Sequence, residues 1–278
     1  MLRFVRITLI ILFCLALIGA VGLYFYRYTR EDTSPPAFRS GTDLLEISVT
    51  DPADALLSDL EAYDNVDGNL TDRIRVKSIS PLINETDVTV TYIVFDEASN
   101  YATCSRTVRY RDYTSPRFNI VQPLIFNVGE AVNFSSSVTV TDLRDGNISG
   151  RLKLEESTVI SSTPGVYSAV LSATNRMGDT ITIPLTIQII DNSITRPSIS
   201  LNKYLIYLER GQRQNWRGYL DSVMDPLADT EDKTVPVNKV SFDATRVDSS
   251  VPGTYEVYYY YTGKSGEIAT TILTVIVE

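Results

Sequence analysis

The strongest pattern of hydrophobic positions lies near the N-terminal end of the chain, where an apolar stretch runs without interruption. Residues 7–26 read ITLIILFCLALIGAVGLYFY and carry no charge. At a rise of about 1.5 Å per residue, a helix of this length reaches roughly 30 Å, which is the thickness of the hydrocarbon core of a bilayer. The pattern therefore predicts one transmembrane helix at residues 7–26, with residues 1–6 in front of it and the rest of the chain on one side of a membrane.

The flanks of this helix bear on its orientation. Two arginines precede the apolar stretch and two follow it, so the positive-inside rule separates the two sides only weakly. We expect a signal anchor with the N-terminus in the cytoplasm, because one side is six residues long and the other holds a whole protein. The alternative is a cleaved signal peptide, with Ile7–Ile18 as its apolar region and Ala20–Gly22 as its cleavage site. The apolar character that continues to Tyr26 favours the anchor.

After a polar spacer at residues 27–37, hydrophobic and polar positions alternate with a period of two. Three segments of this kind superpose without gaps, at residues 86–100, 165–179 and 253–267. Each consists of a strand and a polar turn, and a second alternating strand follows at residues 102–110, 180–190 and 268–277. Alternation with β-branched and aromatic residues around a polar break predicts three β-hairpins. Residues 53–63 and 216–225 are more helix-like, and we expect short turns there.

The alternation also predicts which face of each first strand points into a core. One face is apolar throughout, whereas the other carries residues such as Thr89, Ser168 and Glu256. The predicted core faces are Val88, Val90, Tyr92 and Val94; Tyr167, Ala169, Leu171 and Ala173; and Tyr255, Val257, Tyr259 and Tyr261. We expect truncation of Tyr255 to destabilise its module by about 3–5 kcal/mol, and truncation of Glu256 by well under about 1 kcal/mol.

A second repeated motif lies ahead of the first two hairpins. Residues 64–71 read DNVDGNLT and residues 142–149 read DLRDGNIS, in which the glycine is free to take a positive φ in a tight turn. The third segment reads MDPLADTEDKT at this place, without glycine. Proline-containing joints then divide the chain into three modules, at residues 38–112, 113–191 and 192–278. A repeat of about 80 residues that consists of strands predicts β-sandwich modules.

These motifs resemble a known family. The run D-G-N-[LI]-[TS], followed by a hairpin such as Val88–Asn100, Gly165–Asp179 or Gly253–Glu267, resembles the bacterial Ig-like domains that occur in tandem on cell-surface proteins. Similar hairpins occur in hyalin-repeat and cadherin-like sandwiches. The resemblance covers roughly residues 33–278 and implies an all-β protein with three tandem Ig-like β-sandwich domains behind one transmembrane helix. It specifies a fold better than a function, because such sandwiches serve many roles.

Composition narrows the function classes. After residues 1–32, 21 basic and 32 acidic side chains remain from totals of 25 and 34, which gives about −11 and disfavours nucleic acid as a partner. The chain has no histidine, so it lacks the commonest general base and the usual zinc and copper ligands. Cys104 is the one cysteine beyond the apolar stretch, so no disulfide can form there; this is typical of a bacterial surface rather than of animal secreted domains.

The acidic turns are the first candidate site. Oxygen-bearing side chains recur at odd spacings in both Asp-Gly-Asn segments, namely at Asp64, Asp67, Asn69, Asp142, Asp145 and Asn147. This arrangement resembles the start of a calcium loop. The glycine falls too early for an EF-hand and no glutamate occupies the closing position, so we expect structural turns and no metal site.

Three other groups of residues were weighed in the same way. Tyr258–Tyr261 place two rings on each face of a strand, so one pair faces the core and the other packs across strands or stacks on a sugar. We expect Cys104 to be a buried structural thiol. Four asparagines head N-x-S/T triplets, which matter only in a eukaryotic secretory pathway: Asn69, Asn84, Asn133 and Asn147.

The sequence thus predicts a non-catalytic, single-pass protein of the cell membrane with extracellular C-terminal domains. Residues 7–26 contact the membrane, and the modules serve adhesion, binding or structural spacing with an extracellular protein or polysaccharide as partner. We expect no catalytic residue, no cofactor and no nucleic-acid partner. The alternative is a membrane-anchored subunit that binds or hydrolyses cell-wall glycan with carboxylates. Two carboxyl groups about 5–10 Å apart in a groove would favour that alternative.

Overall fold

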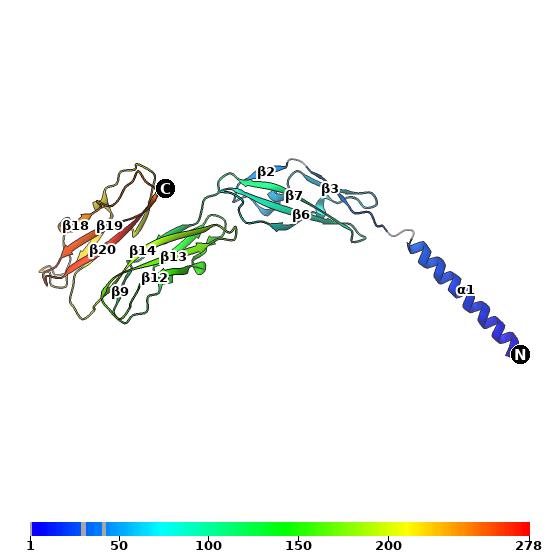
Figure 1. The fold of residues 1–278 in the computed structure, drawn as a ribbon, viewed down its shortest axis with the longest axis horizontal. Coiled ribbons are helices and arrows are strands. Elements are labelled where there is room, and N and C mark those ends of the chain that lie inside the picture. Colours follow the sequence, from blue (N-terminus) through cyan, green and yellow to red (C-terminus); the bar gives the residue numbers. More distant parts are fainter. Residues whose placement is uncertain (1, 29–31, 41–42) are drawn as a thin grey trace. The chain divides into compact units, whose positions relative to one another are not determined.

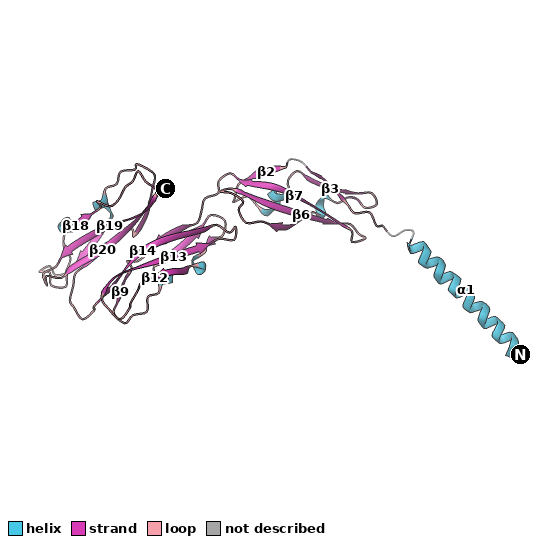
Figure 2. Cartoon of the chain, viewed as in Figure 1, coloured by secondary structure: helices cyan, strands magenta, loops and turns pink. Residues whose placement is uncertain are grey.

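The computed structural model describes residues 2–28, 32–40 and 43–278. In these residues, one long helix is followed by strands and short helical turns (Figures 1 and 2). The chain divides into two compact units, residues 1–111 and 112–278, which are described separately. The prediction of a mostly β protein behind an N-terminal apolar helix is confirmed. The division into three domains stays a prediction.

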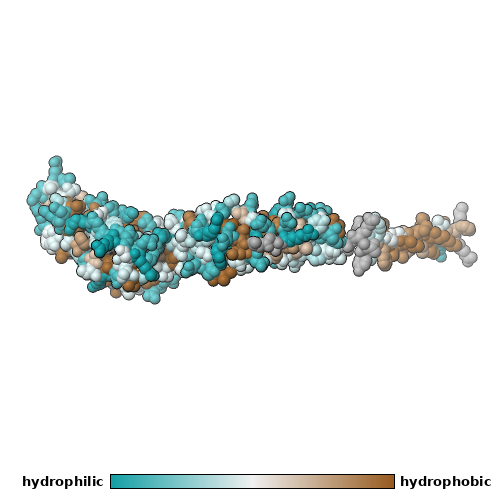
Figure 3. Space-filling model, turned by 90° about the horizontal axis from the view of Figure 1, so that it is seen from above, coloured by the Kyte–Doolittle hydropathy of each residue, from teal (hydrophilic) through white to brown (hydrophobic). Residues whose placement is uncertain are grey.

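The N-terminal helix α1 spans Leu2–Tyr28. Its segment Phe4–Tyr26 has 23 residues and is long and apolar enough to cross a membrane, and none of its side chains is buried by other parts of the protein. In the space-filling view this helix is brown, whereas teal and white predominate over the sheets (Figure 3). The predicted stretch 7–26 lies inside α1. A signal sequence has the same length and composition, so the helix alone does not separate the two alternatives.

The strands of the first unit form two sheets, called here the first sheet pair. One sheet has the order β1-β3-β4 and the other the order β2-β7-β6-β5. The strands are β1 Ala37–Ser40, β2 Leu44–Ile47, β3 Leu60–Asp64, β4 Gly68–Asn69, β5 Arg75–Ile79, β6 Asp87–Phe95 and β7 Tyr101–Tyr110. The predicted hairpin is β6–β7, which is antiparallel from Asp87 opposite Arg109 to Phe95 opposite Tyr101.

The second unit contains two further sheet pairs. The second sheet pair consists of β8 Arg117–Ile120, β9 Ile125–Asn127, β10 Val138–Asp142, β11 Gly146–Asn147, β12 Lys153–Ser157, β13 Gly165–Thr174 and β14 Thr180–Ile190. The third sheet pair consists of β15 Ser198–Leu201, β16 Leu205–Leu208, β17 Leu220–Met224, β18 Ser241–Asp243, β19 Gly253–Thr262 and β20 Ile268–Val277. The hairpins β13–β14 and β19–β20 are the other two that the alternation predicted.

The three sheet pairs share one topology. In each of them, the first strand joins one sheet by antiparallel pairing, and the next strand crosses to the other sheet and pairs in parallel with the last strand. These parallel pairs are β2 with β7, β9 with β14 and β16 with β20. The chain thus crosses from one sheet to the other within a few residues. The two sheets of a pair pack face to face, and their inner faces form the core between them.

Short 3₁₀ turns connect the strands. They lie at Ala53–Leu57, Thr71–Arg73, Phe134–Ser136, Ser149–Arg151, Trp216–Tyr219 and Val237–Lys239. Each of the two helix-like windows of the sequence is therefore a turn followed by a strand. In the first window the turn Ala53–Leu57 precedes β3, and in the second the turn Trp216–Tyr219 precedes β17. The expectation of short turns is confirmed for the first part of each window, whereas the second part is a strand.

The predicted core faces are buried along most of their length. All four residues from Val88 to Val94 on that face are completely buried, as are Ala169, Leu171 and Ala173, and Val257 and Tyr259. Three predicted core residues are only half-buried, namely Tyr167, Tyr255 and Tyr261. Tyr167 and Tyr255 lie near the start of their strands, where each hydroxyl donates to the carbonyl oxygen four residues earlier, at 2.9 Å in both cases. The prediction that Tyr255 faces the core holds in part, because Tyr255 is half-buried and packs against the core of the third pair, whereas Tyr259 is fully buried in that core.

The Asp-Gly-Asn turns adopt the predicted backbone conformation. Gly68 and Gly146 have φ values of 76° and 70°. In the third pair, Lys233 takes the equivalent position with φ 60°, and an isolated bridge between Met224 and Thr234 replaces the short strands β4 and β11. Residues 224–234, which replace the Asp-Gly-Asn motif in the third pair, therefore also place one residue at positive φ, and this residue is not a glycine.

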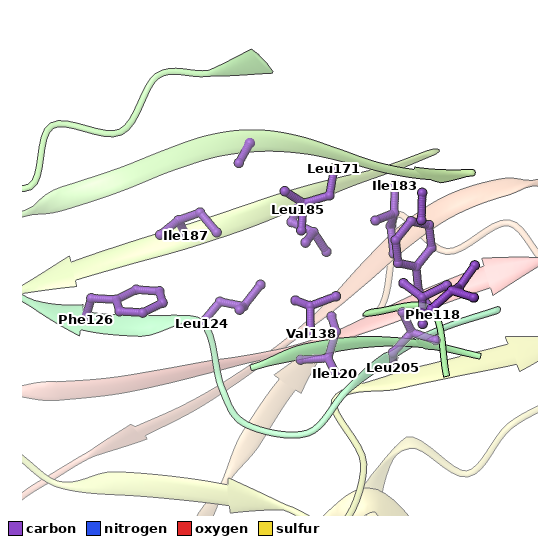
Figure 4. Packing of buried hydrophobic residues seen from close by; sticks show 14 of the residues in the cluster. Phe118, Ile120, Leu124, Phe126, Val138, Leu171, Ile183, Leu185, Ile187 and Leu205 are labelled. Atoms are coloured by element: carbon purple, nitrogen blue, oxygen red, sulfur yellow. The ribbon is translucent and has the colours of Figure 1, made fainter. Parts of the chain in front are cut away.

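The second and third sheet pairs share part of a core. Leu205 from β16 is buried in the cluster that includes Phe118, Ile120 and Val138 (Figure 4). The Tyr207 hydroxyl accepts a hydrogen bond from the Phe118 amide at 2.8 Å. Sequence periodicity predicts strand faces within a module and did not predict this contact between modules.

Candidate functional site

One aspartate recurs at the same place in all three sheet pairs. Asp64, Asp142 and Asp225 lie at or directly after the end of β3, β10 and β17. One carboxylate oxygen of each aspartate accepts a hydrogen bond from the backbone amide two residues later, at 2.8, 2.9 and 3.0 Å. All three side chains are buried, with 2%, 6% and 1% of their surface exposed. The surroundings of the other carboxylate oxygen differ between the three sheet pairs.

In the first sheet pair, the Asp64 carboxylate lies beside two further carboxylates. Asp32, Asp64 and Asp96 each place an oxygen within 4.8 Å of the others. Asp96 is 5% exposed, and Asp32 is half-buried. Asp64 Oδ2 and Asp32 Oδ2 are buried and have no hydrogen-bond partner. We call Asp32, Asp64 and Asp96 the triacid cluster.

The second sheet pair fills the same place with neutral donors. Asn175 occupies the hairpin position that Asp96 has in the first pair, since Asp96 N–H donates to Asn100 O and Asn175 N–H donates to Asp179 O, each at 3.0 Å. The side-chain NH₂ group of Asn175 donates to Asp142 Oδ2 at 3.0 Å and to the Tyr113 hydroxyl at 2.8 Å. Both oxygens of Asp142 therefore have protein partners.

The third sheet pair leaves no room for a side chain at this place. Gly263 has the equivalent hairpin position, and a Cβ atom there would lie 2.9 Å from Pro197 Cγ and 3.2 Å from Asp225 Oδ2. Asp225 Oδ2 accepts from the Lys264 amide at 2.9 Å and from the Tyr261 hydroxyl at 3.4 Å. Asp225 is thus satisfied without a second polar side chain from the hairpin turn.

Hydrogen bonding shifts the pKa values at these places. Backbone amides, first that of Asp67, lower the pKa of Asp64, and the Lys264 amide is the main cause of the lowered pKa of Asp225. Burial, followed by the hydrogen bond to Asp179, raises the pKa of Tyr113. Asp64 is therefore ionised at neutral pH, and its free oxygen carries negative charge.

The other predicted loop ligands are engaged with backbone. Asp67 accepts from the Glu97 amide at 2.6 Å, and Asp145 accepts from the Arg176 amide at 2.7 Å, so each ties the Asp-Gly-Asn turn to the neighbouring hairpin. Asn69 and Asn147 accept from the amide two residues later, each at 2.9 Å. These contacts support the structural-turn interpretation. Of the six loop residues, Asp64 alone has a buried side-chain oxygen without a hydrogen-bond partner and belongs to the triacid cluster.

Sequence reasoning missed Asp32 and Asp96. Asp32 stands in the spacer and Asp96 in the turn of the first hairpin, and they are 64 residues apart. A signal was present, because the three repeats align at 96, 175 and 263 and read Asp, Asn and Gly there. That alignment shows one acidic and two neutral residues at a single structural position.

The tyrosine strand β19 has two different faces. Tyr259 is fully buried, and its hydroxyl donates to Trp216 O at 2.7 Å. Tyr258 and Tyr260 lie on the opposite face as half-buried, stacked rings, with centroids 6.3 Å apart and planes at 9°. The predicted division into one core pair and one outer pair therefore holds in part, since Tyr261 is only half-buried.

A groove of about 300 Å³ borders this outer face. Its lining includes Tyr258, Glu256 and Arg246 from the third sheet pair, and Ser168 and Thr186 from the second. Burial, followed by a 2.6 Å hydrogen bond to Glu256, raises the pKa of Tyr258 to about 12. The groove thus combines an aromatic ring with hydroxyl, carboxylate and guanidinium groups.

The remaining candidates are structural. Cys104 is half-buried, and burial raises the pKa of its thiol, which disfavours the reactive thiolate. All four N-x-S/T asparagines are exposed, and each accepts a hydrogen bond from the amide two residues later, as in an Asx turn: Asn69, Asn84, Asn133 and Asn147.

Comparison with known proteins gives one sequence relative. No protein-family model matches the chain. The chain is 25% identical over 231 residues to the pesticidal crystal protein Cry22Aa of Bacillus thuringiensis. The aligned part is 78% of this chain and 29% of that protein, so the chain spans less than a third of the length of this relative.

Solved structures with similar parts include three from different organisms. CBM51-2 in complex with GlcNAc and INT domains of Clostridium perfringens ZmpB is 18% identical, over 53% of this chain and 26% of that one, with a TM-score of 0.23. The lipoprotein BT2262 of Bacteroides thetaiotaomicron is 11% identical, over 58% and 79%, with a TM-score of 0.23. Drosophila N-cadherin EC1-4 is 13% identical, over 89% and 76%, with a TM-score of 0.23.

Proposed function

We propose that this chain is a single-pass membrane protein that presents three Ig-like sheet pairs outside the cell and binds a ligand with them. The observation that carries the proposal is the combination of an apolar helix with no buried side chain in its 23-residue span and a chain of repeated two-sheet units after it. An apolar surface of this size requires a membrane around it. Each sheet pair buries a hydrophobic core, part of which the second and third pairs share, and leaves loops and outer faces for binding.

The helix acts as an uncleaved anchor with the N-terminus in the cytoplasm. Its apolar window continues to Tyr26, beyond the length of a signal-peptide core. The single cysteine beyond the apolar stretch rules out a disulfide within the exterior, which suits a bacterial surface. The sequence relative from Bacillus thuringiensis supports a bacterial setting.

The groove beside β19 is the proposed ligand-binding site, and a polysaccharide is the proposed ligand. Aromatic rings stack on sugar faces, and hydroxyl and charged groups hydrogen-bond the sugar hydroxyls. Tyr258 supplies a ring that is held by its stacking on Tyr260 and by its hydrogen bond to Glu256. Ser168 and Thr186 supply hydroxyl groups on the facing wall.

We expect the groove beside β19 to bind glycan without hydrolysing it. The groove contains one carboxylate, that of Glu256, whereas glycoside hydrolysis needs a pair. The triacid cluster brings three carboxylates together, but Asp64 and Asp96 are 2% and 5% exposed and cannot flank a polymer. The single carboxylate in the groove and the burial of the triacid cluster support glycan binding without hydrolysis.

Two experiments test this function. Protease added to intact cells or spheroplasts should digest the sheet pairs and leave a small membrane-bound stub, whereas protection of the whole chain would refute the outside location. Recovery of a soluble exterior that starts near Leu23 would instead show cleavage.

In a binding screen against purified cell-wall and host-matrix polymers, Tyr258→Ala should weaken binding at least about tenfold, as expected for a lost stacking contact of about 1–3 kcal/mol. Tyr101→Ala, which removes an exposed tyrosine of the first sheet pair, is the matched control.

A further inference from the structure

The triacid cluster concentrates negative charge that the surrounding protein does not balance. Asp96 accepts two hydrogen bonds from Asn100, at 2.7 Å from the amide N–H and 2.8 Å from the side chain. Among the described residues, no ion pair joins a lysine or arginine to Asp32, Asp64 or Asp96. Carboxylates this close together repel one another, and their burial removes the water that would otherwise screen them.

Two oxygens of the cluster also lack any partner. Asp64 Oδ2 and Asp32 Oδ2 are buried without a hydrogen bond, although Asp64 is 2% exposed. An ionised, buried and unpaired carboxylate is costly, so such groups are normally paired or bind a metal ion.

We propose that the triacid cluster binds one Ca²⁺ ion, with one carboxylate oxygen each from Asp32, Asp64 and Asp96. Calcium–oxygen bonds of about 2.3–2.6 Å allow two ligand oxygens to lie up to about 5 Å apart, and the three oxygens lie within 4.8 Å of one another. All ligands are oxygens, which excludes the soft transition metals. Mg²⁺ is disfavoured because it keeps most of its waters and is usually held by one or two carboxylates.

The other two sheet pairs support this assignment by contrast. Asn175 and Gly263 stand where the first pair has Asp96, and in both places the recurring aspartate has protein partners for both oxygens. The fold therefore does not need a cation at this position. The first pair departs from the other two by adding acids, which is the change that cation binding requires.

A bound ion would connect three segments that are distant in sequence. Asp32 lies in the segment before β1, Asp64 ends β3, and Asp96 directly follows β6. The Asn100 side chain already donates to the Asp32 carbonyl oxygen at 2.9 Å and to Asp96 Oδ2 at 2.8 Å, so part of the site is preorganised. Calcium would fix the spacer segment to the edge of the first sheet pair.

The test is calcium titration of the full chain in a non-ionic detergent after removal of metal with EDTA. Calorimetry should show one saturable site per chain, with a dissociation constant in the range of about 10⁻⁴ to 10⁻³ M or tighter, as in extracellular calcium modules. Mg²⁺ should bind at least tenfold more weakly. Asp96→Asn, which copies the second sheet pair, should weaken calcium binding at least tenfold, whereas Asp142→Asn should leave it unchanged.

A second variant and a stability measurement separate loss of the site from loss of the fold. Asp32→Asn should also lose the calcium site, and in EDTA both variants should unfold at the wild-type temperature or above it, because like charges have been removed. The proposal is overturned if wild type shows no saturable calcium binding up to about ten times that range. It is equally overturned if Asp96→Asn binds like wild type, if Asp142→Asn removes the site, or if both cluster variants unfold in EDTA while wild type stays folded.

Discussion

Asp96 and Asn175 occupy the same turn position in two successive hairpins, and the exchange of one atom changes what their neighbours can do. The side-chain NH₂ of Asn175 donates to Asp142 at 3.0 Å, whereas Asp96 has no N–H group in its side chain to donate to Asp64. In the second sheet pair, the Asn175 side chain therefore completes the hydrogen bonds of Asp142. In the first, Asp96 cannot do the same for Asp64, and Asp64 Oδ2 has no hydrogen-bond partner. Comparison of repeats within one chain separates residues that the fold needs from residues that one copy has added.

The tyrosines of β19 should differ strongly in their effect on stability. Tyr259→Ala should lower the free energy of unfolding of the third sheet pair by about 3–5 kcal/mol, since the side chain is fully buried. Tyr255→Ala should cost less, because Tyr255 is only half-buried, and Glu256→Ala should cost about 1 kcal/mol for the loss of its hydrogen bond from Tyr258. Trp216 is the single tryptophan and lies in this sheet pair, so its fluorescence during denaturant unfolding reports the effect. Equal losses at positions 259 and 256 would contradict the assigned strand register.

The positive φ of the Asp-Gly-Asn turn should appear as a backbone cost. Gly146→Ala should destabilise the second sheet pair by about 1–2 kcal/mol, because an L-residue in the left-handed region is strained. No atom lies within 4 Å of the added Cβ, so a clash does not contribute. Gly150→Ala is the control, since Gly150 has an equally open Cβ position and no positive φ. Thermal unfolding of the full chain compares the two, and similar melting temperatures would argue against backbone strain.

The contact between the second and third sheet pairs should couple their unfolding. Tyr207→Phe removes the acceptor of the Phe118 amide, and an unpaired buried amide costs about 1–3 kcal/mol. We expect calorimetry to show a lower or split transition for residues 112–278. Tyr204→Phe is the comparison, because the Tyr204 hydroxyl accepts only from Leu201 of its own sheet pair, at 3.3 Å. If both variants unfold alike, the Tyr207 bond does not couple the pairs.

Acid should destabilise the first unit through Asp87. The Arg109 guanidinium, followed by the Asn84 amide, holds the pKa of Asp87 far below its usual value, with Arg109 bonds of 2.8 and 2.9 Å. A carboxyl whose pKa is lowered in the folded state contributes stability above its unfolded pKa of about 4, and that stability is lost as the pH falls toward the folded value. Circular dichroism in EDTA should therefore show a falling melting temperature below about pH 4.

The matched variants are Asp87→Asn and Asp72→Asn. Asp87→Asn removes the paired carboxylate and should flatten the acid dependence, while Asp72→Asn removes an exposed carboxylate and should leave the dependence as it is. An unchanged acid slope in Asp87→Asn would assign the effect to other acids.

Local pattern carried the prediction of strands and hairpins, because alternation and turn residues act over a few positions. It failed where residues distant in sequence meet. Arg106 occupies a core-facing position of β7, where its guanidinium donates to the Tyr92 hydroxyl at 3.1 Å and to Leu56 O at 2.8 Å. Ser172 is also buried, on the face expected to be outer. No periodicity indicates such partners, since they depend on how the two sheets and their connections pack.

The triacid cluster shows the same limit for the site. Asp64 was a candidate because its loop resembles other acidic loops. Asp96 is marked only by the alignment of the three repeats, and Asp32 has no local mark that separates it from an ordinary spacer residue. Lys233 gives the opposite case: a loop without glycine still places one residue at positive φ, because pairing around Met224 and Thr234 demands it. Tertiary pairing overrides the preference of the single residue.

The parallel pairing in each sheet pair determines how the chain responds to mechanical tension. A pull on the two ends of the first pair acts near β2 at one end and on β7 at the other, and these strands run parallel from Leu44 opposite Thr107 to Ile47 opposite Tyr110. Such a pull slides the strands lengthwise, so all of their hydrogen bonds bear force together instead of opening one after another. The same geometry recurs in β9 with β14 and in β16 with β20. A protein held at one end and loaded at the other would therefore resist extension at three clamps in series.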